Sequence, residues 1–373
     1  MRYDSIIHED IKTIVRNLGD VSQKLSGKTL LISGGAGFLG RHFLRTFQYL
    51  NRYVLKKPLK VISLDNYITG DRDSSFNNDP NISTMWADVT NPLPARTDVD
   101  YIIHAAGLAS PVYYQKYPLE TIESAVTGAK NLLELGRKNK LSGFLFFSSS
   151  EIYGDPDPKM IPTPETYFGH VSSVGPRACY DESKRLTETI CMIYKQQFGL
   201  PVTVVRPFNV FGPGMKHNDF RVVPMFTYES LNNRLITVHG DGHQTRTFCY
   251  ITDAINGFLR VLLLGKPGEA YNIGSDKNEI SMRNFASLFS DLMPDAKYKL
   301  IPYPPTYPAG EPQRRCPDLT KSRTQLKFEP KVLMRDGVER FVRWAKSQPS
   351  YIDPVPSRRV TRKKTKKLKK AKR

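Results

Sequence analysis

The sequence predicts a doubly wound α/β fold, in which helices cover both faces of a mainly parallel sheet. Short apolar segments alternate along the chain with longer segments of helical periodicity. The apolar segments are continuous, which is typical of parallel strands buried on both faces. Connections between parallel strands are nearly always right-handed, so the alternation favours the doubly wound arrangement. The strand-like segments span residues 29–33, 60–64, 100–104 and 144–148, and the helix-like segments span residues 38–50 and 119–138.

An apolar stripe precedes the first strand. Six apolar residues recur there at alternating spacings of four and three, which places them on one face of a helix. They are Ile7, Ile11, Ile14, Leu18, Val21 and Leu25, and Gly19 interrupts the pattern. We expect this helical extension to pack on the body of the protein. The alternative is a short two-helix contact with another subunit.

The composition is that of a globular protein, and no membrane span is expected. Of the 373 residues, 39% are apolar and 24% are charged, and no run of about 18 apolar residues occurs. The N-terminus lacks the apolar core of a secretion signal, so we expect a cytoplasmic location. The four cysteines lie far apart, which favours reduced thiols over a disulfide framework. His239 and His243 flank Gly-Asp-Gly, which indicates a loop, so no metal is expected.

Positive charge is concentrated at the C-terminus. The net charge is +19, and residues 357–373 contain eleven Lys and Arg and no acid, which leaves +8 for the rest of the chain. Like charges at this density repel one another, so we expect a disordered basic tail over residues 351–373. Such a tail binds an anionic partner, for example nucleic acid or anionic lipid, by counterion release, or it only improves solubility.

We expect four parts along the chain. Residues 1–26 form the helical extension, and residues 27–206 form the domain built on the predicted sheet. From about residue 207 the pattern loosens, and Pro and Gly accumulate at 207–214 and 302–312. We therefore expect residues 207–350 to form a smaller C-terminal α/β lobe, interleaved with the first domain and followed by the tail.

A glycine-rich turn joins the first strand to the helix after it, with glycines at Gly34, Gly37 and Gly40. The first glycine permits a sharp turn, the second lets the backbone approach a pyrophosphate, and the third lets helix and strand pack closely. The helix N-terminus then favours negative charge. The turn predicts a Rossmann-type dinucleotide site that includes Phe38 and Leu39.

Residues at the ends of the following strands are expected to complete this site. Asp65 ends the second strand, where a carboxylate accepts hydrogen bonds from both ribose hydroxyls and repels a 2′-phosphate. No Arg lies in Asp65-Asn66-Tyr67, so NAD is expected rather than NADP. Further cofactor contacts are expected at the next strand ends, although Asp88 is also suited to cap a helix. They are Asn66, Asp88, Val89, Ala105 and Ala106.

A tyrosine and a lysine carry the expected chemistry. Tyr180 and Lys184 lie at the start of a helical pattern, and their spacing places both side chains on one face. Ser149 follows the fourth apolar segment. The charge of Lys184 lowers the pKa of a nearby phenol, so Tyr180 is expected to remove a proton from an alcohol that Ser149 holds while a nicotinamide takes the hydride. Tyr180 and Lys184 are also expected to contact the cofactor, Lys184 through a hydrogen bond to the nicotinamide ribose. Tyr53 and Lys57 have the same spacing but no serine-rich strand end before them.

The order Ser…Tyr-x-x-x-Lys after a glycine-rich turn resembles the short-chain dehydrogenase/reductase superfamily, in its extended branch of NAD-dependent epimerases and dehydratases. Within that branch, Ser149-Ser150-Glu151 is similar to the Thr-Ser-Glu of UDP-glucuronate decarboxylases, whereas 4,6-dehydratases usually have Asp-Glu. The resemblance covers roughly residues 28–345. It is also carried by the segments 153–156, 169–171, 175–184, 218–223, 244–246 and 312–318.

This resemblance implies a reaction and assigns residues to it. UDP-glucuronate is oxidised at its 4-position, the resulting β-keto acid loses carbon dioxide, and re-reduction gives UDP-xylose, so no net redox change occurs. Glu151 and Arg315 are implied at the carboxylate end of the sugar. The resemblance does not say which of them donates the proton and which orients the carboxylate. Asn209 is implied near the diphosphate, Arg221 near the uracil or ribose, and Arg246 on a phosphate.

Three departures from the family pattern lie near the expected substrate pocket. The family's Thr-Asn is Ser124-Ala125 here, a Gly is Phe220, and a Lys is Cys316. The reaction class is therefore better defined than the sugar. One alternative is a nucleotide-sugar 4-epimerase or 4,6-dehydratase. An alternative of another class is a non-catalytic protein that binds NAD, or that binds nucleic acid through its basic tail. The intact Ser149, Tyr180 and Lys184 argue against this alternative.

The resemblance also implies an oligomeric state. Members of this family commonly form homodimers, in which two helices from each subunit make a four-helix bundle. The segments 119–138 and 180–198 match those helices, so a homodimer is expected.

Overall fold

The computed structural model describes residues 4–93, 97–303 and 312–353. The expected disorder of the basic tail, and the anionic partner expected for it, concern residues that lie almost entirely outside the described ranges. Most of the second Pro- and Gly-rich stretch, residues 304–311, also lies outside them.

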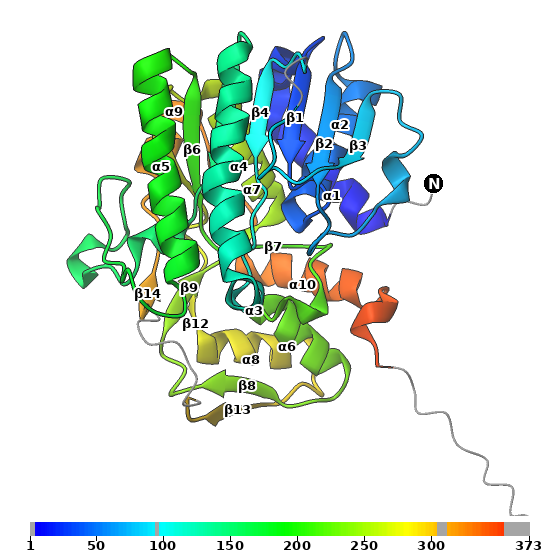
Figure 1. The fold of residues 1–373 in the computed structure, drawn as a ribbon. Coiled ribbons are helices and arrows are strands. Elements are labelled where there is room, and N and C mark those ends of the chain that lie inside the picture. The colour runs from blue at the N-terminus through cyan, green and yellow to red at the C-terminus, as the bar shows by residue number, and fades with distance from the viewer. Residues whose placement is uncertain (1–3, 94–96, 304–311, 354–373) are drawn as a thin grey trace, which may run out of the picture.

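A seven-stranded parallel sheet forms the centre of the molecule (Figure 1). Its strand order is β11-β6-β5-β4-β1-β2-β3, and every neighbouring pair is parallel. This arrangement confirms the predicted doubly wound α/β class. The strands are β1 (Thr29–Ser33), β2 (Lys60–Asp65), β3 (Ile82–Trp86), β4 (Tyr101–His104), β5 (Gly143–Phe147), β6 (Val202–Pro207) and β11 (Ala270–Ile273).

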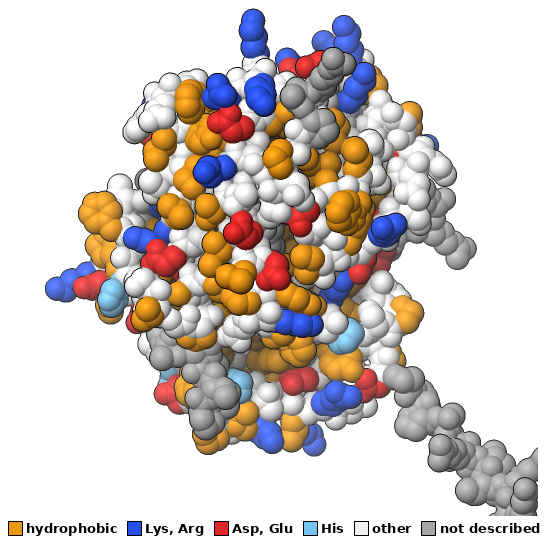
Figure 2. Space-filling view, in the orientation of Figure 1, with side chains coloured by type: hydrophobic (Ala, Val, Ile, Leu, Met, Phe, Trp, Pro, Cys, Tyr) orange, Lys and Arg blue, Asp and Glu red, His pale blue; other side chains and the backbone are white. Residues whose placement is uncertain are grey.

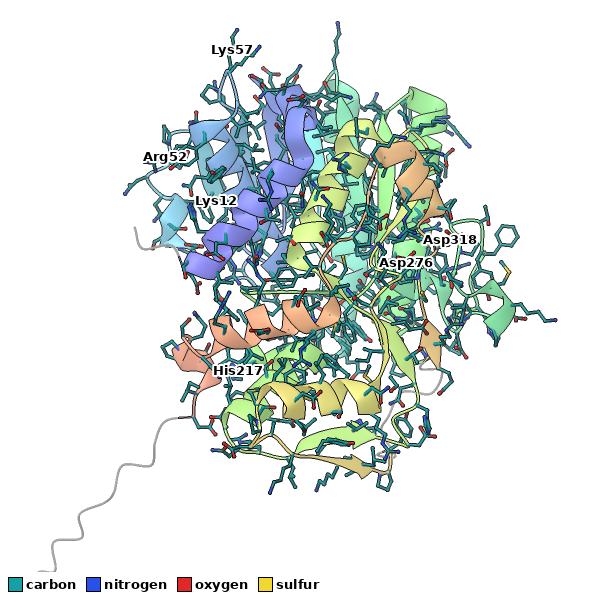
Figure 3. All side chains as sticks on the ribbon, turned by 180° about the vertical axis from the view of Figure 1, so that it is seen from behind. Lys12, Arg52, Lys57, His217, Asp276 and Asp318 are labelled. Atoms are coloured by element: carbon teal, nitrogen blue, oxygen red, sulfur yellow. The ribbon has the colours of Figure 1, made fainter. Side chains whose placement is uncertain are left out.

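Helices cover both faces of this sheet. On the face at the front of Figure 1, α4 packs against α5, and on the opposite face α1 packs against α2 and α7 (Figure 3). Neighbouring residues of a strand point to opposite faces, so Leu31 packs in the core under α4 and α5, whereas Leu30 and Ile32 pack in the core under α2 and α7. The helices are α1 (Ser5–Leu18), α2 (Phe38–Tyr53), α3 (Pro111–Lys116), α4 (Pro118–Lys138), α5 (Ala178–Phe198), α7 (Ile251–Leu264) and α9 (Thr320–Leu326).

The predicted N-terminal stripe is buried within the chain. Ile7, Ile11 and Ile14 pack in the core under α1, and α1 ends before Gly19, whose φ is +57°. Lys12 lies on the opposite side of the helix and points outward (Figure 3). These contacts favour the expected packing on the body over a contact with another subunit.

A buried polar cluster joins α1 to later parts of the chain. The carboxylate of Asp10 accepts a hydrogen bond from the Tyr250 hydroxyl at 2.8 Å and one from Arg340 at 2.5 Å. Burial raises the pKa of Asp10 to about 6, although Arg340 and Tyr250 oppose that rise. Arg340 lies on α10 (Met334–Ala345), so α1 and α10 are tied together although they lie at opposite ends of the described chain.

A smaller lobe lies below the carboxyl ends of the sheet in Figure 1. It contains the helices α6 (Val222–Leu231) and α8 (Met282–Leu292) and several short strands. The later segments α7, β11 and α9 return to the large sheet, so the two parts of the chain alternate. The short strands are β7 (Val210–Phe211), β8 (Ile236–His239), β9 (Thr245–Thr247), β10 (Cys249–Tyr250), β12 (Glu279–Ser281), β13 (Tyr298–Ile301) and β14 (Arg314–Arg315).

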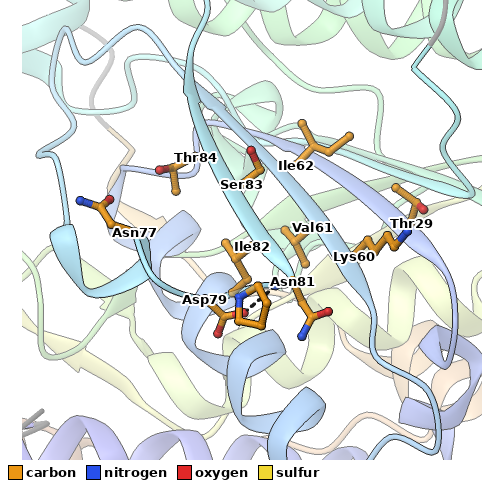
Figure 4. Close-up of a pocket in the computed structure, with 11 residues that line it drawn as sticks. Thr29, Lys60, Val61, Ile62, Asn77, Asp79, Asn81, Ile82, Ser83 and Thr84 are labelled. Atoms are coloured by element: carbon orange, nitrogen blue, oxygen red, sulfur yellow. Dashed lines mark hydrogen bonds between the residues drawn. The ribbon is translucent and has the colours of Figure 1, made fainter.

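Some structural properties bear on function without defining a site. Within the described ranges, no helix is long and apolar enough to cross a membrane, and no three His, Cys, Asp or Glu side chains are grouped as a metal site would require. All four cysteines are free thiols. A groove of about 550 Å³ lies at the amino ends of β1, β2 and β3, where Asp79 accepts a hydrogen bond from the Asn81 N–H (Figure 4). None of the expected site residues lines this groove.

Candidate active site

The glycine-rich turn lies at the carboxyl end of β1. Gly34 has a φ of +79°, and a Cβ at this position would lie 2.8 Å from backbone atoms of Ala105 and Ala106. A Cβ on Gly40 would lie 2.2 Å from the Gly34 carbonyl oxygen. Both positions therefore require glycine. No side chain caps the start of α2 at Phe38, which leaves its first N–H groups to an anion such as a pyrophosphate.

The end of β2 has the geometry of a ribose site. Asp65 accepts hydrogen bonds from the N–H groups of Ala36 at 2.9 Å and Tyr67 at 2.8 Å. Burial raises the pKa of Asp65, and these two N–H groups oppose the rise. Asp65 lines a cavity of about 290 Å³ together with Ala36, Tyr67 and Trp86. The uncapped helix and this half-buried carboxylate fit the pyrophosphate and ribose of a dinucleotide.

The expected adenine-side residues form a local network. Asn66 donates a hydrogen bond to Asp88 at 3.2 Å, and Asp88 also accepts the Thr90 N–H at 2.9 Å. Asp88 therefore closes a turn, and no helix begins there. Val89 is buried, and its carbonyl accepts a hydrogen bond from Asn131.

A central cavity of about 520 Å³ lies between the carboxyl ends of the sheet and the smaller lobe. Five expected cofactor residues line it, namely Phe38, Leu39, Ala105, Tyr180 and Lys184. Every expected catalytic and substrate residue also lines it, although these residues come from six different segments. They are Ser149, Glu151, Tyr180, Lys184, Asn209, Arg221, Arg246 and Arg315. The remaining expected cofactor residues do not line this cavity, and they are Gly34, Gly37, Gly40, Asp65, Asn66, Asp88, Val89 and Ala106.

Tyr180 lies in the first turns of α5 with its phenol buried. Burial raises the pKa of Tyr180, and a hydrogen bond with Ser149 opposes that rise. The Tyr180 ring stacks on Tyr114 of α3, with 5.3 Å between the ring centroids and 18° between the planes. This contact was not predicted from the sequence. The stacking and the serine together hold the phenol against the central cavity.

Lys184 lies one helical turn after Tyr180, as the spacing predicts. Its ammonium donates a hydrogen bond to the Phe147 carbonyl at 2.8 Å and lies 5.8 Å from the centre of the Tyr180 ring. Burial lowers the pKa of Lys184 to about 8. The lysine is therefore fixed to the end of β5, close to the Tyr180 phenol.

Glu151 is held between two arginines. Ser149 accepts the Glu151 N–H at 3.2 Å and so caps the short helix that presents the carboxylate. Arg315 of β14 forms two hydrogen bonds with this carboxylate, one of them at 3.0 Å. Arg177, which precedes α5, also forms an ion pair with it. Arg177 was not predicted, although it lies three positions before Tyr180 and its position in that motif was the available signal.

The residues expected to bind the UDP part come from the smaller lobe and its connections. Asn209 donates a hydrogen bond to the Thr247 carbonyl at 3.2 Å. Arg221 pairs with Asp219; burial opposes the charge of Arg221, but this carboxylate raises its pKa overall. Arg246 is buried on β9 and donates to the Thr245 carbonyl at 2.8 Å. Two guanidinium groups therefore face one cavity, as a diphosphate requires.

The three departures from the family pattern have different surroundings. Phe220 has a φ of +60°, is 57% exposed and lines the central cavity, so this chain places a bulky side chain at a left-handed position that favours glycine. Ala125 is buried in α4, and its carbonyl accepts a hydrogen bond from Thr187 of α5. Cys316 is buried beside Arg315 and burial raises the pKa of its thiol to about 12.

A dinucleotide turn, a buried Ser–Tyr–Lys group and a second lobe that completes the cavity define a class of nucleotide-sugar enzymes. The NAD dependent epimerase/dehydratase family matches residues 30–274, and the chain belongs to this family. It is similar to UDP-glucuronic acid decarboxylase 5 of Arabidopsis thaliana, with 37% identity over 316 residues, which are 84% of this chain and 88% of the relative. UDP-glucuronic acid decarboxylase 1 of Xenopus tropicalis is 36% identical over 324 residues, or 86% of this chain and 73% of the relative.

Solved structures of other sugar-nucleotide enzymes have the same fold. A dTDP-glucose 4,6-dehydratase from Streptomyces venezuelae, crystallised with NAD, gives a TM-score of 0.76 at 25% identity, covering 87% of this chain and 99% of its own. A UDP-glucuronic acid 4-epimerase from Bacillus cereus, in complex with UDP-glucuronic acid and NAD, gives a TM-score of 0.71 at 25% identity, covering 85% and 99%. The cofactor of this family is NAD, in agreement with the sequence-based expectation.

Proposed function

We propose that this protein decarboxylates UDP-glucuronate to UDP-xylose with a retained NAD. The observation that carries the proposal is the carboxylate of Glu151 between Arg177 and Arg315, in the same cavity as Tyr180. Guanidinium groups at this place suit a substrate that brings its own carboxylate. The similarity to relatives named UDP-glucuronic acid decarboxylase supports the same reaction.

The first step is proton removal at the sugar. The phenolate of Tyr180 takes the proton of the 4-hydroxyl, and the hydroxyl of Ser149 holds the oxygen that loses it. The ammonium of Lys184 favours the phenolate by its charge. When bound, NAD would supply the hydride acceptor for the same carbon and, once reduced, the hydride donor for the later return. Phe38, Leu39 and Ala105 are the residues of the central cavity that would hold its nicotinamide end.

Loss of carbon dioxide follows from the ketone. The carboxylate on C5 is β to the new C4 carbonyl, so the electrons of the bond between C5 and C6 move into an enolate as carbon dioxide leaves. C5 then takes up a proton from water in place of the lost carboxylate. Arg315 orients the carboxylate, and Glu151 lies beside it at the face where the proton arrives. After reduction of C4, Tyr180 returns its proton and the product is the pentose.

The UDP part is bound on the other side of the cavity. Arg246 contacts a phosphate, Arg221 lies near the ribose or uracil, and Asn209 lies near the diphosphate. Each of these side chains has a protein partner that fixes its direction in the cavity. Charge-assisted hydrogen bonds from a guanidinium to phosphate are among the stronger polar contacts.

Product analysis tests this proposal. The purified protein with NAD is incubated separately with UDP-glucuronate, UDP-glucose and dTDP-glucose, and the products are identified by mass and chromatography. We expect UDP-xylose and carbon dioxide from UDP-glucuronate, without net change in NADH absorbance. A UDP-galacturonate product would instead identify a 4-epimerase, and a 4-keto-6-deoxy sugar would identify a dehydratase. Either result contradicts the proposal.

We also propose that the protein forms a homodimer through α4 and α5. These two helices pack side by side and carry exposed apolar side chains, which lie among polar ones on the front face in Figure 2. The exposed residues are Leu119, Ile122, Leu186 and Ile193. Light scattering should give the mass of two chains, and Leu186→Glu should give one. Leu333→Glu, at an exposed position outside these helices, is the control and should leave the dimer intact.

A cytoplasmic location is part of the proposal. The four free thiols are typical of a reducing compartment. Fractionation of cells with antibody detection would test it, and recovery from a secretory compartment would contradict it. The anionic partner expected for the basic tail is tested by comparing vesicle and RNA binding before and after deletion of residues 357–373.

A further inference from the structure

Arg177 is fixed in the turn that leads into α5. Its carbonyl accepts hydrogen bonds from the N–H groups of Tyr180 at 3.0 Å and Asp181 at 3.1 Å. Its side chain is 15% exposed and lines the central cavity. The backbone of Arg177 is therefore tied to the same helical turn that carries the Tyr180 phenol.

The guanidinium of Arg177 contacts a carboxylate on each of two sides. Its Nε lies 3.6 Å from the buried carboxylate of Asp181, on the helix side. Its Nη2 contacts Glu151 on the cavity side. A planar guanidinium presents separate donor edges, so Asp181 sets the direction in which Arg177 reaches Glu151.

Glu151 is thus shared by two arginines that reach it from different parts of the chain. Arg177 comes from the start of α5, and Arg315 comes from β14 in the smaller lobe. One guanidinium suffices to bind a carboxylate through two oxygens. The second guanidinium therefore provides hydrogen-bond donors in the cavity for another carboxylate, close to Tyr180.

If the proposed function holds, the carboxylate of the bound substrate changes how Glu151 is shared between the two arginines. The sugar carboxylate arrives beside Glu151, and two like charges at this distance repel one another in a poorly hydrated cavity. With Arg315 alone, both carboxylates would compete for one guanidinium. With Arg177 present, each carboxylate has its own partner.

We propose that Arg177 is a specificity-determining residue, which holds Glu151 in place when Arg315 turns to the substrate carboxylate. It thereby makes the site prefer acidic sugar nucleotides over neutral ones. The other two arginines of the cavity do not share this role, because Arg221 pairs with Asp219 and Arg246 with a backbone carbonyl.

Two ligands that differ in the carboxylate test this inference. Binding of UDP-glucuronate and UDP-xylose is measured by calorimetry on the NAD-loaded protein, in a Tyr180→Phe background that prevents turnover. Arg177→Gln should weaken UDP-glucuronate binding about tenfold or more, as expected for a lost charge-assisted contact, and change UDP-xylose binding less than about twofold. Arg177→Lys, which keeps the charge, should recover part of the loss.

Controls separate the possible outcomes. Arg335→Gln removes one positive charge at an exposed position on α10 and should change neither affinity. Equal weakening of both ligands by Arg177→Gln would mean a structural role, and no weakening would mean no role; either result overturns the inference. In parallel, the reaction product of the unsubstituted protein is identified by mass spectrometry. Failure to form UDP-xylose there would contradict the proposed function, whereas the ratio of the two affinities reports on Arg177 alone.

Discussion

The dinucleotide side and the carboxylate side of the site are assembled in different ways. On the dinucleotide side, Ala36 and Asp65 meet across 29 positions of sequence, within one strand–helix–strand unit. On the carboxylate side, Glu151 meets Arg315 across 164 positions, because the smaller lobe closes onto the end of the sheet. The first arrangement depends on local geometry and the second on long-range folding. We therefore expect changes on one side to leave binding on the other side largely intact.

Tyr180→Phe should have the largest effect. Removal of the phenol oxygen eliminates the group that takes the substrate proton, and general acid–base catalysis typically contributes about 10²–10⁴-fold. We expect kcat to fall by that factor while the affinities for NAD and UDP change little. Turnover is measured by mass, and binding by calorimetry. Intact turnover would remove Tyr180 from the chemistry.

Gly34→Ala should act on the dinucleotide side alone. The substitution puts a side chain at a φ of +79° and 2.8 Å from the Ala105 and Ala106 backbone. A strained non-glycine residue costs about 1–3 kcal/mol, so NAD affinity should fall about tenfold or more. Binding of free UDP, measured on the same preparation, should stay within about twofold. An equal loss of both would show that the two sides are not independent.

Arg246→Ala should have the opposite pattern. Loss of the charge-assisted contact with a phosphate should weaken UDP binding by about 1.5–3 kcal/mol, or about tenfold and more. NAD affinity should be unchanged, because Arg246 lies on β9 in the smaller lobe. Arg335→Gln is the matched control for charge. Unchanged UDP affinity in the Arg246 variant would exclude the phosphate contact.

The pH profile should show the smallest effect. A lysine carries its charge below its pKa, and burial lowers the pKa of Lys184 to about 8, so this charge is lost as the pH rises through about 8. We expect kcat/KM to fall to half near that pH and further above it. In Lys184→Arg the charge persists, so any remaining activity should lack this alkaline decline. A decline at the same pH in both proteins would assign it to another group.

Local patterns in the sequence predicted much of this molecule. β1 spans the predicted residues because a short, continuous apolar run between turns has few secondary structures open to it other than a buried strand. The Tyr180 and Lys184 pair was identifiable because helical spacing alone places both on one face. Glu151, Arg315 and the residues for the UDP part were implied by a family resemblance, and all expected catalytic and substrate residues line one cavity.

Other features had no local signal. Arg177 reaches Glu151 only because the turn before α5 lies next to the end of β5. Tyr114 reaches Tyr180 only because the fold brings α3 next to the start of α5. Phe220 was recognised as a departure from the family, but its position at the cavity depends on a backbone conformation that composition does not reveal. Contacts between distant segments depend on the complete fold, so patterns of spacing miss them.

The contact between Asp10 and Arg340 has a consequence for biosynthesis. These two residues are 330 positions apart, so during synthesis α1 obtains this partner only after the ribosome has translated the long stretch of chain between them. Until then, Ile7, Ile11 and Ile14 present an apolar surface with an incomplete set of neighbours. The emerging chain therefore carries an apolar helix that chaperones can bind until α7 has been made, and its buried polar contact forms only after synthesis has passed α10.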